Sequence, residues 1–255
     1  MRSESELAAA ADENFVASFR KLVEHCPGAE MRDFGGVLAF VTGLQLALFN
    51  GCVVTRPATP ADLGAALKWV GDHNLPHRAW ITHRMPELGG MPPAHGLQPE
   101  PEPYPGMVLH PLTEAPEPSS GVTIVPITDA NLDEFVQVGL EGGVREDMSE
   151  RLFTPSFASD PDVQLFVGRL NDRPVGTSIA IRSESASGVY NVGTLPQARR
   201  HGIGAALTWA AVEAGRAWSY DTIVLQSSAM GFAMYAAMGF RTVAPYTVFS
   251  PPVSA

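Results

Sequence analysis

Cationic residues and glycines that could bind an anion stand together in one short run of the sequence, Arg199-Arg200-His201-Gly202-Ile203-Gly204. The N-terminus of a helix presents free N–H groups and a positive dipole end, and glycine lets an anion approach the backbone. The chain has a formal net charge of -10, so this turn reverses the sign of the charge locally. A polyphosphate ligand would need such a reversal.

The segments on either side of this run predict that it connects a strand to a helix. Residues 189–194 have the β-branched and aromatic content of a strand, which Pro196 ends. An alanine-rich apolar stripe from residue 205 predicts a helix that ends near Gly215 or Trp218. Residues 222–225 read as a second buried strand, and residues 231–238 as a short helix. The order is a βαβα unit with its ligand at the carboxyl ends of the strands.

Other interpretations of the glycine turn remain open at this point. Glycines at a strand-to-helix junction can serve close packing alone. The spacing lacks the Gly-x-Gly-x-x-Gly of dinucleotide-binding proteins and the Gly-x-x-x-x-Gly-Lys-Ser/Thr of P-loop proteins. A phosphate site for another nucleotide is a further alternative.

The two motifs together resemble the GNAT superfamily of N-acetyltransferases, whose signature Arg/Gln-x-x-Gly-x-Gly/Ala stands here as residues 199–204. The family's later pattern, Asn-x-x-Ala-x-x-Leu-Tyr-x-x-x-Gly-Phe, aligns with residues 228–240, where Tyr235, Gly239 and Phe240 match. Two positions differ from the pattern: Ser228 replaces the asparagine and Gly231 replaces the alanine. Two motifs in this order are more specific than either one.

The resemblance implies an α/β fold with a mixed, mostly antiparallel central sheet flanked by helices, and acetyl-CoA as cosubstrate. It also implies site residues. Val192, Gly193 and Thr194 would hold the acetyl carbonyl and the pantetheine arm, the turn would hold the pyrophosphate, and Tyr235 would protonate the leaving thiolate. The implied cofactor-binding residues are Val192, Gly193, Thr194, Arg199, Arg200, His201, Gly202, Ile203, Gly204, Ala205 and Ser228. No metal is expected.

Upstream segments supply the rest of such a domain, which we predict over residues 121–255. Residues 122–125 read as a strand, and Thr128 or Asp129 can cap the apolar helix that follows. Residues 163–170 and 174–181 read as two strands joined by the turn pair Asn171-Asp172.

Residues 1–110 are predicted to form a divergent, non-catalytic half of a tandem acetyltransferase, or else a cap domain. A hairpin is expected at residues 36–49 with its turn at Thr42-Gly43, a strand at 53–55, a helix from Thr59 and a strand at 77–81. This half has no Arg-x-x-Gly-x-Gly turn. Residues 91–120 are rich in proline and glutamate and predict a stiff, solvated linker without a helix, in which residues 107–109 could be a packed strand.

The sequence does not identify a catalytic base. Glu141, Glu146, Asp147 and Glu150 cluster near the first helix of the second half, where a solvated acidic face is the favoured interpretation. Without its motif, Tyr235 would be read as a core tyrosine with its hydroxyl pointing outward.

Composition excludes several classes of protein. The acidic balance disfavours nucleic acid, and no run of 18 apolar residues and no signal-peptide core are present, so a soluble cytoplasmic protein without a membrane partner is expected. The two cysteines, Cys26 and Cys52, are expected to be packing residues, since a disulfide framework or a four-cysteine zinc site needs more of them. Pro76 spoils the pairing of His73 and His77 as metal ligands.

Two functions of different classes follow. The first is an N-acetyltransferase that acts on a primary amine of a small molecule or peptide by direct attack. The second is a catalytically silent acyl-CoA-binding sensor or scaffold. The sequence identifies neither the acceptor nor the oligomeric state, for which a homodimer is one alternative.

Overall fold

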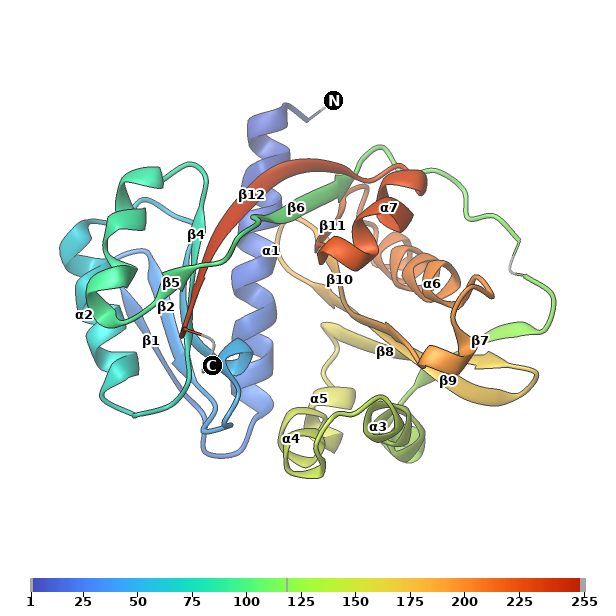
Figure 1. Cartoon of the computed structure of the whole chain (residues 1–255). Coiled ribbons are helices and arrows are strands. Elements are labelled where there is room, and N and C mark those ends of the chain that lie inside the picture. The colour runs from blue at the N-terminus through green and yellow to red at the C-terminus, as the bar shows by residue number, and fades with distance from the viewer. Residues whose placement is uncertain (1, 118, 253–255) are drawn as a thin grey trace.

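One twisted sheet runs through the whole molecule (Figure 1). The structure is a computed structural model that describes residues 2–117 and 119–252. Within these residues, twelve strands form a single sheet. The strands are β1 (Glu30–Phe34), β2 (Val37–Val41), β3 (Asn50–Val54), β4 (Arg78–Thr82), β5 (Gln98–Pro99), β6 (Tyr104–Leu109), β7 (Val122–Ile127), β8 (Val163–Leu170), β9 (Arg173–Arg182), β10 (Ser187–Thr194), β11 (Ile223–Gln226) and β12 (Arg241–Ser250). The α-helices are α1 (Glu4–His25), α2 (Pro60–Gly71), α3 (Leu132–Glu141), α4 (Glu146–Leu152), α5 (Pro155–Ala158), α6 (Ile203–Ala217) and α7 (Ala229–Ala237).

The two halves of the chain repeat one arrangement of strands. In the first half, β1, β2 and β3 are antiparallel neighbours, and α2 then crosses over to the parallel strand β4. In the second half, β8, β9 and β10 are antiparallel neighbours, and α6 crosses over to the parallel strand β11. The predicted repetition of the fold in the N-terminal half is therefore confirmed, as is the mixed, mostly antiparallel sheet.

The last strand of each half lies against the sheet of the other half. The strand order is β1-β2-β3-β4-β12-β6-β11-β10-β9-β8-β7, with β5 paired to β12. The C-terminal strand β12 thus pairs with β4, while β6, which precedes the second half, pairs with β11. This exchange joins the halves through backbone hydrogen bonds.

The proline-rich segment contributes more structure than the sequence predicted. Residues 107–109 lie in β6 and are buried, which confirms the packed strand. Pro92–His95 forms a short 3-10 helix with Pro92 buried, so the expectation of a solvated linker without any helix is wrong there. Proline is tolerated at this position because the first residues of a helix need no N–H partner.

The expected hairpin at residues 36–49 is also wrong in its second strand. After β2 the chain forms a loop with a 3-10 helix at Ala47–Phe49, and β2 pairs with β3 instead. The buried amide of Asn50 organises this loop, because its oxygen accepts from the Thr42 N–H (2.9 Å) and its nitrogen donates to the Leu44 carbonyl (2.8 Å). The predicted β8–β9 hairpin is confirmed, with Asn171 and Asp172 at φ 49° and 65° in its turn.

The first helix, α1, lies across the centre of the sheet and contacts strands of both halves (Figure 1). No secondary structure was predicted for residues 4–25 from the sequence. Ser3 caps the helix by accepting from the Glu6 N–H, and the Glu6 carboxylate accepts in return from the Ser3 N–H (2.6 Å). Its buried face includes Leu7, Phe15 and Phe19. Among the described residues, no helix is long and apolar enough to cross a membrane.

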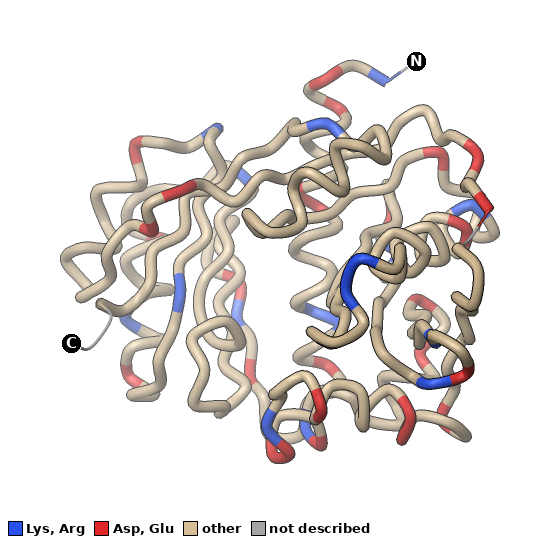
Figure 2. Tube along the Cα trace, turned by 45° about the vertical axis from the view of Figure 1, so that its right-hand side comes forward, with Lys and Arg blue, Asp and Glu red and all other residues tan. Residues whose placement is uncertain are grey.

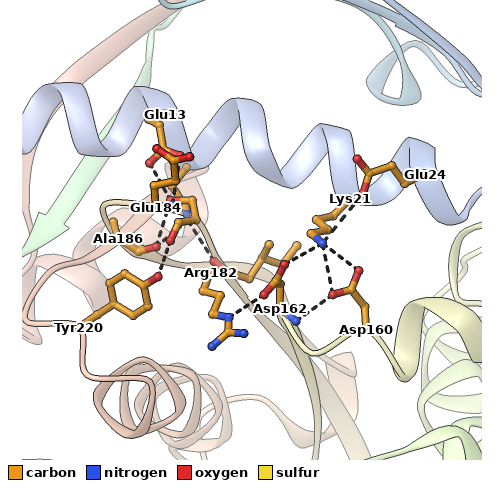
Figure 3. Close-up of polar contacts among 12 residues, drawn as sticks. Glu13, Lys21, Glu24, Asp160, Asp162, Arg182, Glu184, Ala186 and Tyr220 are labelled. Carbon is orange, nitrogen blue, oxygen red and sulfur yellow. Dashed lines mark hydrogen bonds and ion pairs between the residues drawn. The ribbon is translucent and has the colours of Figure 1, made fainter.

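Ion pairs hold α1 against the second half (Figure 3). The Lys21 ammonium lies 2.9 Å from Asp160 and 2.8 Å from Asp162, and Arg182 donates to Asp162 at 2.7 Å. The hydrogen bond from Lys21 makes the larger contribution to lowering the pKa of Asp162 below its usual value, and the hydrogen bond from Arg182 makes the next largest. Further along α1, the Glu13 carboxylate accepts from the Ser183 hydroxyl at 2.7 Å.

Candidate functional site

A gap between β10 and β11 defines the candidate site. The two strands run parallel but pair only at Ser187 with Ile223 and at Gly188 with Val224. Further along β10, the register with β9 shifts between Tyr190 and Gly193, where Asn191 has φ 50°. A bulge of this kind bends its strand. The part of β10 after Gly188 therefore has an edge that no strand covers on the β11 side, and its backbone groups are available to a ligand.

A cavity of about 440 Å³ lies at this gap. Seven of the predicted site residues line it: Val192, Gly193, Thr194, Arg199, Gly204, Ser228 and Tyr235. The cavity is thus bounded by the end of β10, the start of α6 and the first turns of α7. From the order of the two motifs we expected these segments to form one site. In the structure they line one cavity.

The turn before α6 exposes the N-terminus of the helix. Arg200 and Gly202 adopt left-handed conformations, with φ 66° and 80°, and Gly202 is the N-cap residue without a side-chain cap. The Ala206 N–H donates to the Gly202 carbonyl at 2.9 Å, so the N–H groups of the residues before Ala206 have no partner within the helix. Such groups are the donors that a phosphate accepts from.

The remaining predicted residues of the turn lie outside the cavity lining. They are Arg200, His201, Gly202, Ile203 and Ala205. The Ile203 side chain is only 1% exposed and packs in the core, so only its backbone could serve a ligand. Nδ1 of His201 lies 2.9 Å from the Arg199 carbonyl oxygen. Figure 2 shows a band of basic residues at this turn, in front of α6.

Tyr235 stands on α7 with its ring largely buried. Its side chain is 8% exposed and meets Phe240 edge to face at 5.9 Å between ring centroids. Burial raises the pKa of Tyr235 to about 12, although the nearby Thr208 hydroxyl acts in the opposite direction. The phenol therefore keeps its proton at neutral pH and can donate it.

At position 228 the family pattern has an asparagine, whereas this chain has a serine that begins a helix. Ser228 is the N-cap of α7, and its hydroxyl accepts from the Gly231 N–H at 3.3 Å. Serine is a strongly preferred N-cap residue, so the substitution is locally consistent with the fold.

The opposite wall of the cavity was not identified from the sequence. Phe135 and Val138 of α3 and Phe153 after α4 line it, together with Thr177 and Asn191 of the sheet. The apolar spacing of α3 predicted a buried face but could not separate residues facing the core from residues facing a cavity. The left-handed Asn191 marks the bulge, and asparagine adopts that conformation more readily than most residues.

Among the described residues, no carboxylate or histidine lines the cavity, and the titratable or charged residues that do so are Arg199 and Tyr235. The acidic side chains considered as bases are exposed: Glu141, Glu146, Asp147 and Glu150. Asp147 pairs with Arg145 at 2.8 Å and Glu141 with Arg173 at 3.4 Å. The interpretation of a solvated acidic face is confirmed.

Both cysteines are buried and free, and burial raises the pKa of each thiol. Their predicted role as packing residues is therefore confirmed. The Nδ1 atoms of His73 and His77 each lie 2.9 Å from a backbone carbonyl oxygen, those of Trp69 and Leu75.

The corresponding place in the first half is closed. The parallel strands β3 and β4 stay paired as far as Val54 and Ile81, so no gap opens between them. The N-terminus of α2 is occupied by its own side chains, because the Asp62 N–H donates to the Thr59 hydroxyl and the Asp62 carboxylate accepts from the Thr59 N–H at 2.8 Å. An anion has no free donors here comparable to those of α6.

Comparison with known proteins agrees with this geometry. Residues 126–240 match the model of the Acetyltransferase (GNAT) family. The chain therefore carries an acetyltransferase domain of the GNAT family in its C-terminal half. No curated protein sequence matches the chain.

Solved structures resemble almost the whole chain. A GCN5-related N-acetyltransferase from Kribbella flavida is 19% identical over 97% of this chain and 96% of its own, with a TM-score of 0.70. A tandem GNAT protein from the clavulanic acid biosynthesis pathway is 14% identical over 98% of both chains, with a TM-score of 0.62. A GCN5-related N-acetyltransferase from Sphaerobacter thermophilus is 14% identical over 98% of this chain and 93% of its own, also with a TM-score of 0.62. At this identity the likeness concerns the fold, which is that of a tandem arrangement.

Proposed function

We propose that this chain is an N-acetyltransferase that transfers the acetyl group of acetyl-CoA to a primary amine of a small molecule or peptide. The observation that carries the proposal is the cavity in which the open edge of β10, the uncapped start of α6 and Tyr235 meet. A protein that needed these segments only for packing would gain nothing from leaving that strand edge and that helix end without partners.

Acetyl-CoA fits the donors that this site offers. The pyrophosphate would accept from the N–H groups of the turn and of the first residues of α6, beside Arg199 and Arg200. The pantetheine arm carries amide groups, which would pair with the open edge of β10 as an added strand would. The acetyl carbonyl would then lie at the bulge, within reach of the backbone of Val192.

The chemistry follows from the groups present. The amine nitrogen attacks the thioester carbon, a C–N bond forms, and the oxygen gains negative charge that backbone N–H groups at the bulge can stabilise. When the C–S bond breaks, the thiolate takes the proton of the Tyr235 phenol. The raised pKa of Tyr235 keeps that proton available until it is needed. Tyr235 recovers a proton from solvent, and the amine releases its own to water.

A second candidate function rests on the absence of a carboxylate or histidine from the cavity lining. A catalytically silent acyl-CoA-binding sensor or scaffold needs the cavity but no base. An acetyltransferase can work without a base at the site only if the acceptor arrives as a neutral amine or loses its proton to water.

The Tyr235→Phe variant separates the two functions. Calorimetry of the wild type with acetyl-CoA and CoA should give micromolar binding, and release of the CoA thiol should depend on an added amine. In the variant we expect binding to be retained and kcat to fall by about 10² or more, because general acid catalysis contributes that much. Tyr220→Phe is the matched control, since that hydroxyl donates to the Ser183 carbonyl in the packing against α1.

Two results would count against the transferase. Binding of CoA without thiol release by any amine would favour the sensor or scaffold. Absence of binding to either ligand would exclude both functions.

A further inference from the structure

Residues 142–153, which include α4, contribute to the wall of the cavity opposite β10. Gly142, Val144 and Phe153 of this segment line the cavity. In the proposed function the pantetheine arm takes the edge of β10 and the pyrophosphate takes the start of α6. The wall formed by residues 142–153 is therefore left for the reacting end, where the acetyl group meets the incoming amine.

The outer side of this wall packs against the first half of the chain. Phe153 packs on the core of the second half, where its ring meets Phe135 edge to face at 5.0 Å between ring centroids, and also on a small apolar cluster between the halves. The buried members of this inter-half cluster are Cys26 directly after α1, Leu44 in the loop after β2 and Leu152 of α4. None of these three residues lines the cavity, so the cluster reaches the cavity through Phe153.

Arg151, in the last turn of α4, connects the wall to the first half by hydrogen bonds. Its Nη2 atom donates to the Pro27 carbonyl at 2.8 Å and also to the Thr42 carbonyl. The guanidinium lies beside two left-handed glycines of the first half, Gly28 at φ 72° and Gly43 at φ 78°. A Cβ on Gly43 would lie 3.2 Å from Nη1 of Arg151, so this glycine leaves room for the guanidinium.

The position of α4 depends on such contacts. The helix has seven residues, too few to be stable by itself. Within the second half it packs against α3, where the Ser149 hydroxyl is buried but has no hydrogen-bond partner among the described residues. The hydrogen bonds of Arg151 therefore fix α4 to the first half more directionally than the contact with α3 fixes it to its own half.

We propose that Arg151 is a positioning residue, which anchors α4 on the first half and thereby sets the place of Phe153 in the cavity wall. The inference rests on the proposed function, because that function defines the amine and the thioester that meet at this wall. It gives the first half, whose strands β3 and β4 stay paired, a part in the reaction of the second half. Arg151 acts through α4 and does not itself line the cavity.

The first test removes the two hydrogen bonds with Arg151→Met, which keeps an apolar stem. The probe is acetyl-CoA with n-hexylamine, benzylamine and glycinamide, and the amine that releases thiol fastest is used. We expect kcat/KM for this amine to fall about tenfold, within the loss of about 10² that a misplacement of about 1 Å can cause. The Kd of CoA from calorimetry should be unchanged, because CoA would bind through β10 and α6.

Two further variants show whether the effect belongs to the anchoring. Arg151→Lys can still donate to a carbonyl and should recover part of the lost kcat/KM. Arg173→Met is the matched control, since Arg173 is 63% exposed and pairs with Glu141 of the same half. It should leave kcat/KM unchanged.

A variant in the first half tests the same contact from the other side. Leu44→Ala opens the inter-half cluster at a position outside the cavity and should lower kcat/KM for the amine, as Arg151→Met does. Leu63→Ala removes an equally buried leucine of α2 from the core of the first half. Both leucine variants should lose stability, but only Leu44→Ala should change kcat/KM.

Hydrogen exchange reports on α4 without turnover. Amides of residues 146–153 should exchange faster in Arg151→Met than in the wild type, whereas those of α6 should not. An unchanged kcat/KM in folded Arg151→Met, or a loss of CoA affinity as large as the loss of kcat/KM, would overturn the inference. Absence of thiol release from the wild type with all three amines would instead overturn the proposed function, and the role of Arg151 toward the amine with it.

Discussion

Gly188 and Val224 are the last residues that pair β10 with β11, and beyond them the second half of the sheet opens into the candidate site. The equivalent parallel strands of the first half remain paired to Val54 and Ile81. The two halves therefore share a fold but differ in the one feature that admits a ligand between parallel strands. This difference between the halves lies in the backbone pairing of β10 with β11 and of β3 with β4.

One molecule of CoA should consequently bind to each chain. Within the part of the chain that the structure describes, β3 and β4 stay paired without a gap, and Thr59 and Asp62 occupy donors at the N-terminus of α2. Calorimetric titration with CoA should give a stoichiometry of one. The Asp62→Ala variant frees the N-terminus of α2 but leaves β3 and β4 paired, so the stoichiometry should stay at one. Two sites in the wild type would show that the paired strands do not exclude the ligand.

The sequence predicted the second half well because its signals are local. Pro196 ends a strand, Asn171 and Asp172 form a turn that requires positive φ, and the glycines lie where a strand meets a helix. These features depend on neighbours in the chain, so they located the strand, the turn and the helix. The resemblance to the GNAT superfamily then implied the seven predicted residues that line the cavity.

Long-range contacts explain what the sequence did not predict. The exchange of β6 and β12 between the halves depends on which strands pair, and hydrophobic patterning does not encode a partner. The loop after β2 follows from one buried amide, Asn50, whose partners include the Pro76 carbonyl at 2.9 Å. The opposite wall of the cavity comes from α3, which reaches this place only through its packing against β8 and β9.

Gly202→Asp should abolish CoA binding. The change places a negative charge and a Cβ at the turn that would face the pyrophosphate, where φ is 80°. Gly96→Asp is a matched control, since Gly96 has the same φ of 80° and open space around its Cβ position, but lies in the first half. Both variants carry similar backbone strain, but a Cβ at position 202 also meets the Ser119 hydroxyl at 2.6 Å, so the loss of thermal stability should be somewhat larger in Gly202→Asp. Loss of binding in both variants, or in neither, would contradict an anion site at Gly202.

The pH dependence of turnover tests the role of Tyr235. Burial raises the pKa of Tyr235 to about 12 from the usual 10.0, so the phenol stays protonated where an exposed tyrosine would begin to ionise. As pH rises from 8, kcat should show no fall around pH 10, because a general acid with a raised pKa loses its proton only near that higher value. Rates measured with saturating amine and acetyl-CoA check this. A descending limb centred near 10 would indicate either an unperturbed tyrosine or another acid.

Removal of the Lys21 ammonium should loosen α1 from the second half. In Lys21→Met, Asp160 and Asp162 lose a shared partner, and we expect the free energy of unfolding at pH 7 to fall by about 1 kcal/mol, the value for a charged hydrogen bond reduced for partial exposure. Urea unfolding measures this change. Lys68→Met is the control, because the Lys68–Asp72 pair is 72% and 62% exposed and should contribute little.

The same two variants also test how the stabilisation from Lys21 changes as the pH falls. The pKa values of Asp160 and Asp162 are lower in the folded protein than the usual 3.8, so their contribution is fully present above that value and is lost as pH falls through the lower folded values. The difference in unfolding free energy between wild type and Lys21→Met should therefore be constant from pH 7 to about pH 5. It should shrink only below pH 4, once the carboxylates take up protons and no longer bind the ammonium. A difference that persists unchanged to pH 2 would assign the effect of Lys21→Met to packing of the lysine stem along α1 and not to its charge.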